Sequence, residues 1–122
     1  MQQFKACVVG AGYWGKNHIH TLDEIGALGG IVDSSIEQLD YFSKKFPNIK
    51  CYQSVDDALQ NPEFSGFTVA TPAETHYKLA KSIITSNKNV LIEKPFVSTI
   101  KEAEDLISLS KKHSINLMVG HL

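Results

Sequence analysis

Three glycines near the N-terminus follow a short apolar run at the spacing G-x-G-x-x-G. The run, residues 4–9, is β-branched at its end, as expected of a buried strand in a parallel sheet. Gly10 would let the chain turn sharply out of that strand, Gly12 would let backbone approach a pyrophosphate, and Gly15 would let the next helix pack closely. The pattern is typical of a dinucleotide-binding turn, although glycines at this spacing also occur in ordinary turns.

Asp33 supports the dinucleotide interpretation, because it ends a second apolar run about 20 residues after the third glycine. A carboxylate at that place accepts hydrogen bonds from the hydroxyls of an adenosine ribose. The alternative is that Asp33 only caps the next helix, but Ser34 and Glu37 already offer that helix a capping box. Asp33 would also repel the 2′-phosphate of NADP, and no arginine lies nearby to receive it. We therefore expect NAD, with NADP disfavoured.

Apolar runs alternate with helical patterns along the whole chain. Strands are predicted at 4–9, 28–32, 49–52, 64–70, 90–92 and 115–119. Helices are predicted at 12–25, 35–46, 54–61, 73–86 and after a second capping box formed by Thr99 and Glu102. Side chains expected on the inner faces of these helices include Ile25, Ile36, Ile100 and Ile107. The alternation predicts an α/β fold: a single domain with a doubly wound, right-handed parallel sheet of Rossmann type, in the order 3-2-1-4-5-6.

Composition argues against several classes of partner. A net charge of −1 over 122 residues gives no basic footprint for nucleic acid. No apolar stretch approaches the roughly 20 residues that span a bilayer, and the N-terminus lacks a signal-peptide pattern, so we expect a cytoplasmic protein without membrane contact. Cys7 and Cys51 lie in predicted strands with no histidine at metal spacing, so we expect reduced thiols and no metal site.

Two further polar segments follow predicted strands, Thr71-Pro72 with His76, and Glu93-Lys94-Pro95. In an open parallel sheet, the carboxyl ends of the strands share one edge, and ligands bind there. Each segment also has a structural alternative. Pro72 is suited to ending a strand, His76 could be a solvated residue in the first turn of a helix, and residues 93–95 could be a polar loop. The residues alone leave these alternatives open.

The order and separations of these motifs resemble the N-terminal domain of the Gfo/Idh/MocA oxidoreductase family. The resemblance covers essentially all of the chain, and Glu93-Lys94-Pro95 is its most specific part. Enzymes of that family use a nicotinamide cofactor to oxidise or reduce a hydroxyl of a sugar, cyclitol or nucleotide sugar. Among its branches, residues 12–17 and Val119-Gly120-His121 look most like the bacterial UDP-N-acetylglucosaminuronate 3-dehydrogenases.

The resemblance implies roles for individual residues. Lys94 would be a catalytic residue that assists proton transfer from the hydroxyl being oxidised. The implied cofactor contacts come from the glycine turn and the other motifs of the same edge: Gly10, Gly12, Tyr13, Trp14, Gly15, Asp33, Thr71, Pro72, His76, Glu93 and Lys94. The Lys94-Pro95 bond is expected to be cis, because the chain must reverse directly after a buried strand and family members commonly have this bond.

In the family, a second α/β domain supplies a catalytic histidine and aspartate, and this sequence lacks it. We therefore expect residues 1–122 to be the dinucleotide-binding domain of a longer NAD(P)-dependent oxidoreductase, inactive alone and a homo-oligomer when intact. Apolar surface is expected near Phe96, Val97 and Leu122. The alternative is a stand-alone nucleotide-binding or regulatory module without catalysis. Lys94 and His76 favour the enzyme, since a sensor needs neither.

Overall fold

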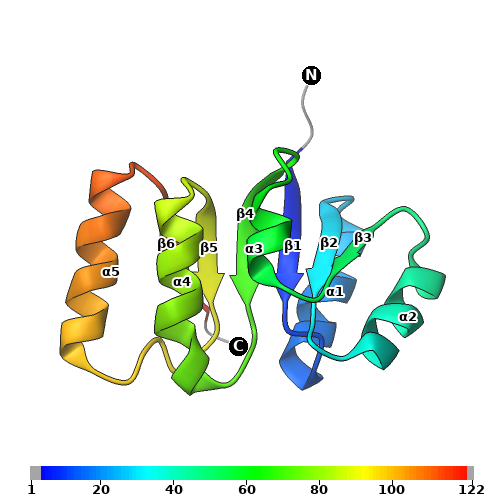
Figure 1. Ribbon diagram of the computed structural model, residues 1–122, viewed down its shortest axis with the longest axis horizontal. Helices are drawn as coiled ribbons and strands as arrows, with labels where there is room; N and C mark the ends of the chain where they lie inside the picture. The colour runs from blue at the N-terminus through cyan, green and yellow to red at the C-terminus, as the bar shows by residue number, and fades with distance from the viewer. Residues whose placement is uncertain (1–3, 121–122) are drawn as a thin grey trace.

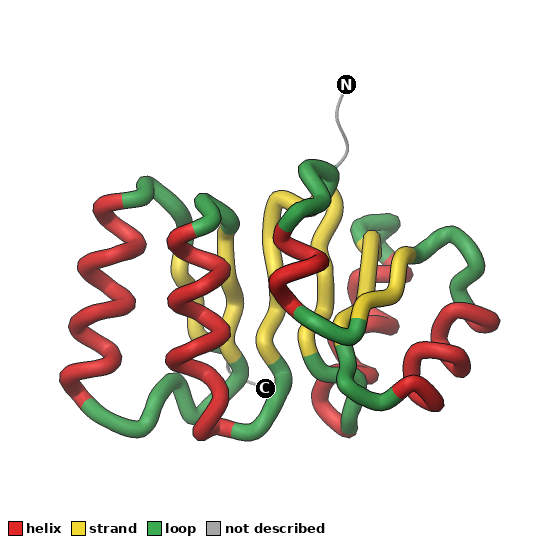
Figure 2. The backbone as a smooth tube through the Cα atoms, in the orientation of Figure 1, coloured by secondary structure: helices red, strands yellow, loops and turns green. Residues whose placement is uncertain are grey.

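The computed structural model describes residues 4–120, which form a six-stranded parallel sheet with helices on both faces (Figures 1 and 2). The strands are β1 (Lys5–Val9), β2 (Leu28–Val32), β3 (Lys50–Tyr52), β4 (Phe64–Val69), β5 (Asn89–Ile92) and β6 (Leu117–Val119). Their order is β3-β2-β1-β4-β5-β6, and every neighbouring pair is parallel. The predicted Rossmann topology is confirmed.

Five α-helices connect the strands within the described residues. They are α1 (Tyr13–Glu24), α2 (Ile36–Lys45), α3 (Val55–Leu59), α4 (His76–Thr85) and α5 (Ile100–Lys112), and a 3₁₀ turn, η1 (Ala73–Thr75), precedes α4. None of these helices is long and apolar enough to cross a membrane.

The core has two parts because successive side chains of each strand point to opposite faces of the sheet. Val8 of β1 and Ile31 of β2 pack with Ile19 of α1 on one face. Val9 of β1 belongs to the core on the other face, where α3, α4 and α5 lie. Both parts are buried, so β1 and β2 are packed on both of their faces.

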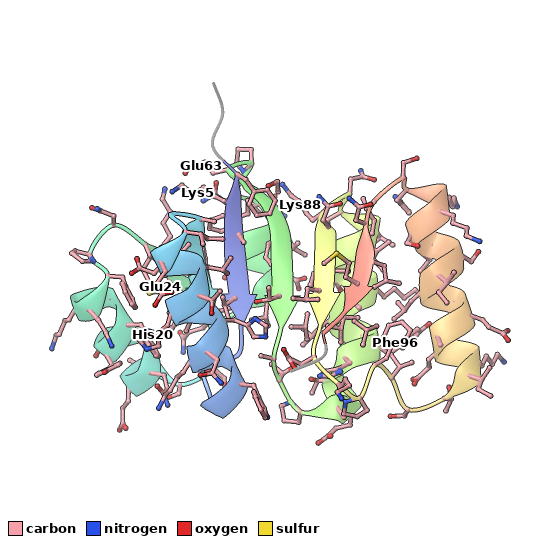
Figure 3. All side chains as sticks on the ribbon, turned by 180° about the vertical axis from the view of Figure 1, so that it is seen from behind. Lys5, His20, Glu24, Glu63, Lys88 and Phe96 are labelled. Atoms are coloured by element: carbon pink, nitrogen blue, oxygen red, sulfur yellow. The ribbon has the colours of Figure 1, made fainter. Side chains whose placement is uncertain are left out.

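The helices α1 and α2 cover only the β1-β2-β3 half of their face. In Figure 3, none of the described helices lies over β4, β5 and β6 on the side facing the viewer. A shallow groove of about 280 Å³ runs there, lined by side chains that include Leu91 and the exposed Met118. The buried hydroxyl of Thr68 also lines it and finds no hydrogen-bond partner among the described residues. Apolar surface was expected near Phe96, Val97 and Leu122. Phe96 and Val97 are instead half-buried against the core, and Leu122 lies outside the described residues.

Two local predictions need correction. The N-cap of α2 is Ser35, whose hydroxyl accepts the Gln38 N–H at 3.3 Å, and not Ser34. At the start of α5, Thr99 is the N-cap as predicted, and its hydroxyl accepts the Glu102 N–H at 3.1 Å. The Glu102 carboxylate, however, accepts the N–H of Ser98 at 3.2 Å and not that of Thr99, so the second half of the predicted capping box is displaced by one residue.

Four side chains expected on inner helix faces are exposed instead: Ile25, Ile36, Ile100 and Ile107. Three of them lie at helix ends: Ile25 is the C-cap of α1, and Ile36 and Ile100 are the first residues of α2 and α5. Ile107 lies within α5 but beside the buried Leu106, which is the residue that reaches the core. The buried stripes are therefore shorter and narrower than expected.

The two cysteines are free thiols, as expected. Burial raises the pKa of the Cys7 thiol well above its usual range. Burial, followed by the charge of Asp40, also raises the pKa of Cys51.

Candidate functional site

The glycine turn joins β1 to α1 at the carboxyl edge of the sheet. Gly10 has a φ of +97°, in the left-handed region that favours glycine, and a Cβ there would lie 2.9 Å from Cγ2 of Thr71. A Cβ on Gly15 would lie 1.7 Å from the carbonyl oxygen of Gly10, which no packing could accommodate without moving α1. Both glycines are therefore needed for the helix to begin so close to the strand.

Gly12 differs from the other two glycines. It is the N-cap of α1 and has no side chain to bond the first N–H groups of that helix. A Cβ on Gly12 would have no heavy atom of residues 4–120 within 4 Å. The first turn of α1 also contains no acidic residue. The start of α1, which no N-cap side chain covers, therefore presents the positive end of the helix dipole to open space, which suits an anion.

A cavity of about 390 Å³ adjoins this open space. Gly10 and Gly12 line it from the glycine turn, Asp33 from the end of β2, and Thr71 and Pro72 from the end of β4. Three motifs that are far apart in the sequence therefore share one cavity. Its other walls are mainly apolar, as for a site that buries part of a ligand.

Asp33 is half-buried and holds the edge of the cavity together. Its Oδ2 accepts the Ala11 N–H at 2.7 Å, and its Oδ1 accepts the Ser35 N–H at 2.8 Å. The carboxylate thus ties the glycine turn to the start of α2. Each oxygen has a further lone pair for a ribose hydroxyl, because a carboxylate offers about four acceptor sites.

The turn after β4 is ordered by two hydroxyl groups. Thr75 donates to the carbonyl oxygen of Pro72 at 2.6 Å, and the hydroxyls of Thr71 and Thr75 lie 2.6 Å apart. Since the Thr75 proton is used, Thr71 donates to Thr75. This pair fixes Thr71 and Pro72 at the wall of the cavity.

His76 is buried behind this turn and does not line the cavity. Its Nε2 lies 2.8 Å from the carbonyl oxygen of Thr71, and its Nδ1 lies 2.8 Å from that of Pro95. The ring therefore links the segment after β4 to the segment after β5. The first-turn location predicted for His76 is confirmed, but the ring is not solvated.

The Glu93-Lys94-Pro95 segment follows β5 at the same edge. The Lys94-Pro95 bond is cis, as predicted. Glu93 is buried, whereas Lys94 is exposed. His18 of α1 reaches Glu93, with its Nε2 2.5 Å from Oε1 of the carboxylate.

Five of the eleven residues predicted to contact the cofactor share one cavity. Gly10, Gly12, Asp33, Thr71 and Pro72 line the cavity, and Gly15 sets the position of α1. Trp14 is exposed on the first turn of α1, and nothing is described of the Tyr13 side chain. Contact of a cofactor with all of these residues, and with His76, Glu93 and Lys94, stays a prediction.

His18 was not among the predicted residues. It lies three residues after Gly15, in the helix that the glycine turn opens, and the sequence offers no other sign of its role. Its partner lies 75 residues away in the sequence, so no local pattern could have revealed the contact.

Comparison with known proteins agrees with this geometry. Residues 4–121 match the family described as "Oxidoreductase family, NAD-binding Rossmann fold", Gfo/Idh/MocA. The chain is 28% identical over 122 residues to UDP-N-acetylglucosamine 3-dehydrogenase of Acidithiobacillus ferrooxidans, covering 100% of this chain and 38% of that protein. The chain thus spans less than two-fifths of this relative.

Solved structures are similar to almost the whole chain. The structure of GenD2 from gentamicin A biosynthesis, in complex with NAD, has a TM-score of 0.92 and 28% identity, covering 98% of this chain and 35% of that one. A putative oxidoreductase of Bacteroides fragilis has a TM-score of 0.89 and 30% identity, covering 99% and 38%. The fold, the cavity at the strand ends and the match over residues 4–121 agree, and the chain belongs to the Gfo/Idh/MocA oxidoreductase family, of which it forms an NAD-binding Rossmann domain.

Proposed function

We propose that this chain is the cofactor domain of an enzyme that transfers hydride between NAD and a hydroxyl-bearing carbon of a sugar, cyclitol or nucleotide sugar. The activity is proposed for the gene product as a whole, because the chain spans only 38% of the dehydrogenase that it resembles. The single observation that carries the proposal is the open side of Gly12, at the start of α1 and within the cavity that Asp33 also lines.

The residues of the cavity fit the two ends of a dinucleotide. The start of α1 would take the pyrophosphate, because its N–H groups donate to anionic oxygens and Gly12 leaves room for close approach. Asp33 would accept from the ribose hydroxyls with its remaining lone pairs. Thr71 and Pro72 would face the nicotinamide half, on the far side of the glycine turn from Asp33.

Lys94 is the residue of this chain that we assign to the chemistry. When bound, the nicotinamide supplies a carbon that accepts or gives up hydride. Oxidation of an alcohol also releases the hydroxyl proton, and an exposed amine at this edge can take that proton or pass it on. The ammonium form would return a proton in the reverse direction.

The name of the Acidithiobacillus relative supports a nucleotide-sugar substrate. Residues 12–17 and the segment at Val119 lead us to the narrower proposal of a UDP-N-acetylglucosaminuronate 3-dehydrogenase. Part of that segment, His121, lies outside the described residues. We extend the proposal to a homo-oligomer, with the second catalytic domain supplied by the rest of the gene product. Free thiols fit a cytoplasmic location.

Two measurements test the proposal. Calorimetric titration of the chain with NAD and NADP should give tighter binding of NAD, and equal or tighter NADP binding would contradict the assignment of Asp33. The complete gene product should reduce NAD when supplied with UDP-N-acetylglucosaminuronate, and Lys94→Ala should lower kcat by roughly 10²–10⁴-fold. NAD binding without turnover of any sugar or nucleotide sugar would favour a binding module.

A further inference from the structure

Glu93 is a buried carboxylate next to the exposed Lys94. Its side chain is 10% exposed and that of its partner His18 is 13% exposed. A Cβ on Gly120 would lie 3.1 Å from Glu93 Oε1, so the end of β6 closes over the carboxylate from the other side. Glu93 is therefore enclosed between α1 and the segment after β6.

The residue after Lys94 is held as well. Nδ1 of His76 lies 2.8 Å from the carbonyl oxygen of Pro95 and 3.1 Å from that of Phe96. His18 belongs to α1 on one face of the sheet, and His76 belongs to α4 on the other (Figure 1). Two histidines from opposite faces thus hold the residues before and after Lys94. His18 does so through the Glu93 carboxylate and His76 through backbone carbonyl oxygens, while the Lys94 side chain stays exposed.

We propose that His18 is a positioning residue: through Glu93 it fixes Lys94 relative to α1, the helix whose N-terminus would hold the pyrophosphate. This inference rests on the proposed function of Lys94. It explains why a buried carboxylate directly precedes an exposed lysine. The contact joins the part of the chain that would bind the cofactor to the part that would handle the proton.

The hydrogen-bond chemistry assigns the direction of the contact. An ionised Glu93 can only accept, so His18 donates from Nε2. Without this donor, the enclosed carboxylate loses its partner and must move toward water, because an unpaired buried charge is unfavourable. Lys94 would move with it. A displacement of about 1 Å at a reacting group can lower the rate about 100-fold.

The experiment uses the complete gene product with NAD and UDP-N-acetylglucosaminuronate. The variants are His18→Ala, His18→Gln, Lys94→Ala and the double variant of His18→Ala with Lys94→Ala. The matched control is His20→Ala, since His20 is an exposed histidine of the same helix that contacts only the edge of Phe46 among the described rings (Figure 3). We measure kcat, the Kd for NAD and the thermal midpoint of each variant.

We expect His18→Ala to lower kcat about 10- to 100-fold while the Kd for NAD changes less than about threefold. His18→Gln should recover most of the rate, because its amide also donates to Glu93. In the Lys94→Ala background, His18→Ala should cause no further loss, since there is no lysine left to position. If His18 served stability alone, His18→Ala would lower the thermal midpoint. His18→Gln would then not restore kcat, and the losses from His18→Ala and Lys94→Ala would not depend on each other.

Two outcomes would overturn the inference. One is a kcat for His18→Ala equal to that of His20→Ala, and the other is a loss that multiplies with that of Lys94→Ala. If His18→Ala does not fold, His18→Gln carries the test, and its smaller loss must also vanish in the Lys94→Ala background. A Lys94→Ala variant with unchanged kcat would instead refute the proposed function of Lys94 itself.

Discussion

The two substitutions Gly12→Ala and Gly15→Ala separate cofactor binding from folding within one turn. Both add a single methyl group to the same motif. On Gly15, the methyl carbon would lie 1.7 Å from the carbonyl oxygen of Gly10, so α1 must move away from β1. On Gly12, the methyl carbon would meet no described atom within 4 Å, and its φ of −76° is open to alanine.

Gly15→Ala should lower the stability of the fold, whereas Gly12→Ala should lower the affinity for NAD. Forcing a methyl into a packed site costs about 1–3 kcal/mol, so Gly15→Ala should lower Tm by roughly 4–12 °C. Gly12→Ala should leave the fold unchanged or stabilise it by about 0.4–1 kcal/mol, because alanine has less conformational freedom when unfolded. Its methyl group would instead occupy the place of a phosphate oxygen. Loss of one charged hydrogen bond costs about 1.5–3 kcal/mol, a roughly 10- to 100-fold weaker NAD affinity.

The assay is thermal unfolding followed by circular dichroism, together with calorimetric titration of NAD, on the unsubstituted chain and both variants. We expect Gly12→Ala to bind NAD weakly at full stability. Normal NAD affinity in Gly12→Ala would refute the reasoning, because the open side of Gly12 would then have no ligand to receive. Loss of stability equal to that of Gly15→Ala would also refute it.

Three further predictions concern single side chains. Asp33→Asn should lose about 1 kcal/mol of stability in urea unfolding, because its amide group would face one of the two backbone N–H donors, and the ratio of NAD to NADP affinity should fall. In the native chain at pH 8, a thiol reagent should label Cys51 before Cys7. Cys7 is fully buried, its burial raises the pKa of the thiol above the usual range, and the thiolate is the form that reacts. Labelling of Cys7 before Cys51 would contradict the burial of Cys7. A hydrogen bond from Tyr77, and then the charge of Lys81, lower the pKa of Asp105. The ionised carboxylate therefore stabilises the fold above the ordinary Asp pKa of about 3.9, and this stability is lost as the pH falls below that value. Tyr77→Phe should reduce this pH dependence of the free energy of unfolding.

The topology could be predicted because it depends on patterns that repeat along the chain. Apolar runs and helical periods alternate without interruption, and the handedness of the crossovers leaves few arrangements open. The glycine turn could be predicted for a different reason. A Cβ at Gly10 or Gly15 would clash with neighbouring atoms, so a helix that begins this close to the end of a strand requires glycine at both positions.

The features that the sequence did not predict correctly depend on contacts between segments that are distant in the sequence. Ser34 and Ser35 each have a Glu or Gln three residues later, so the sequence offers two equivalent capping boxes for α2. Asp33 decides between them, because its carboxylate takes the Ser35 N–H while it also holds the glycine turn. The His18–Glu93 pair is of the same kind, since only the folded sheet brings α1 to the end of β5.

The most direct test of the central claim locates NAD on the chain. In a nuclear magnetic resonance titration of the isotope-labelled chain, NAD should shift the backbone amide signals of Gly12, Asp33 and Thr71, which line the cavity. The signals of Glu63 and Lys88, at the opposite edge of the sheet, should stay in place (Figure 3). Shifts confined to the opposite edge, or no shifts at millimolar NAD, would contradict the assignment of this edge as the dinucleotide site.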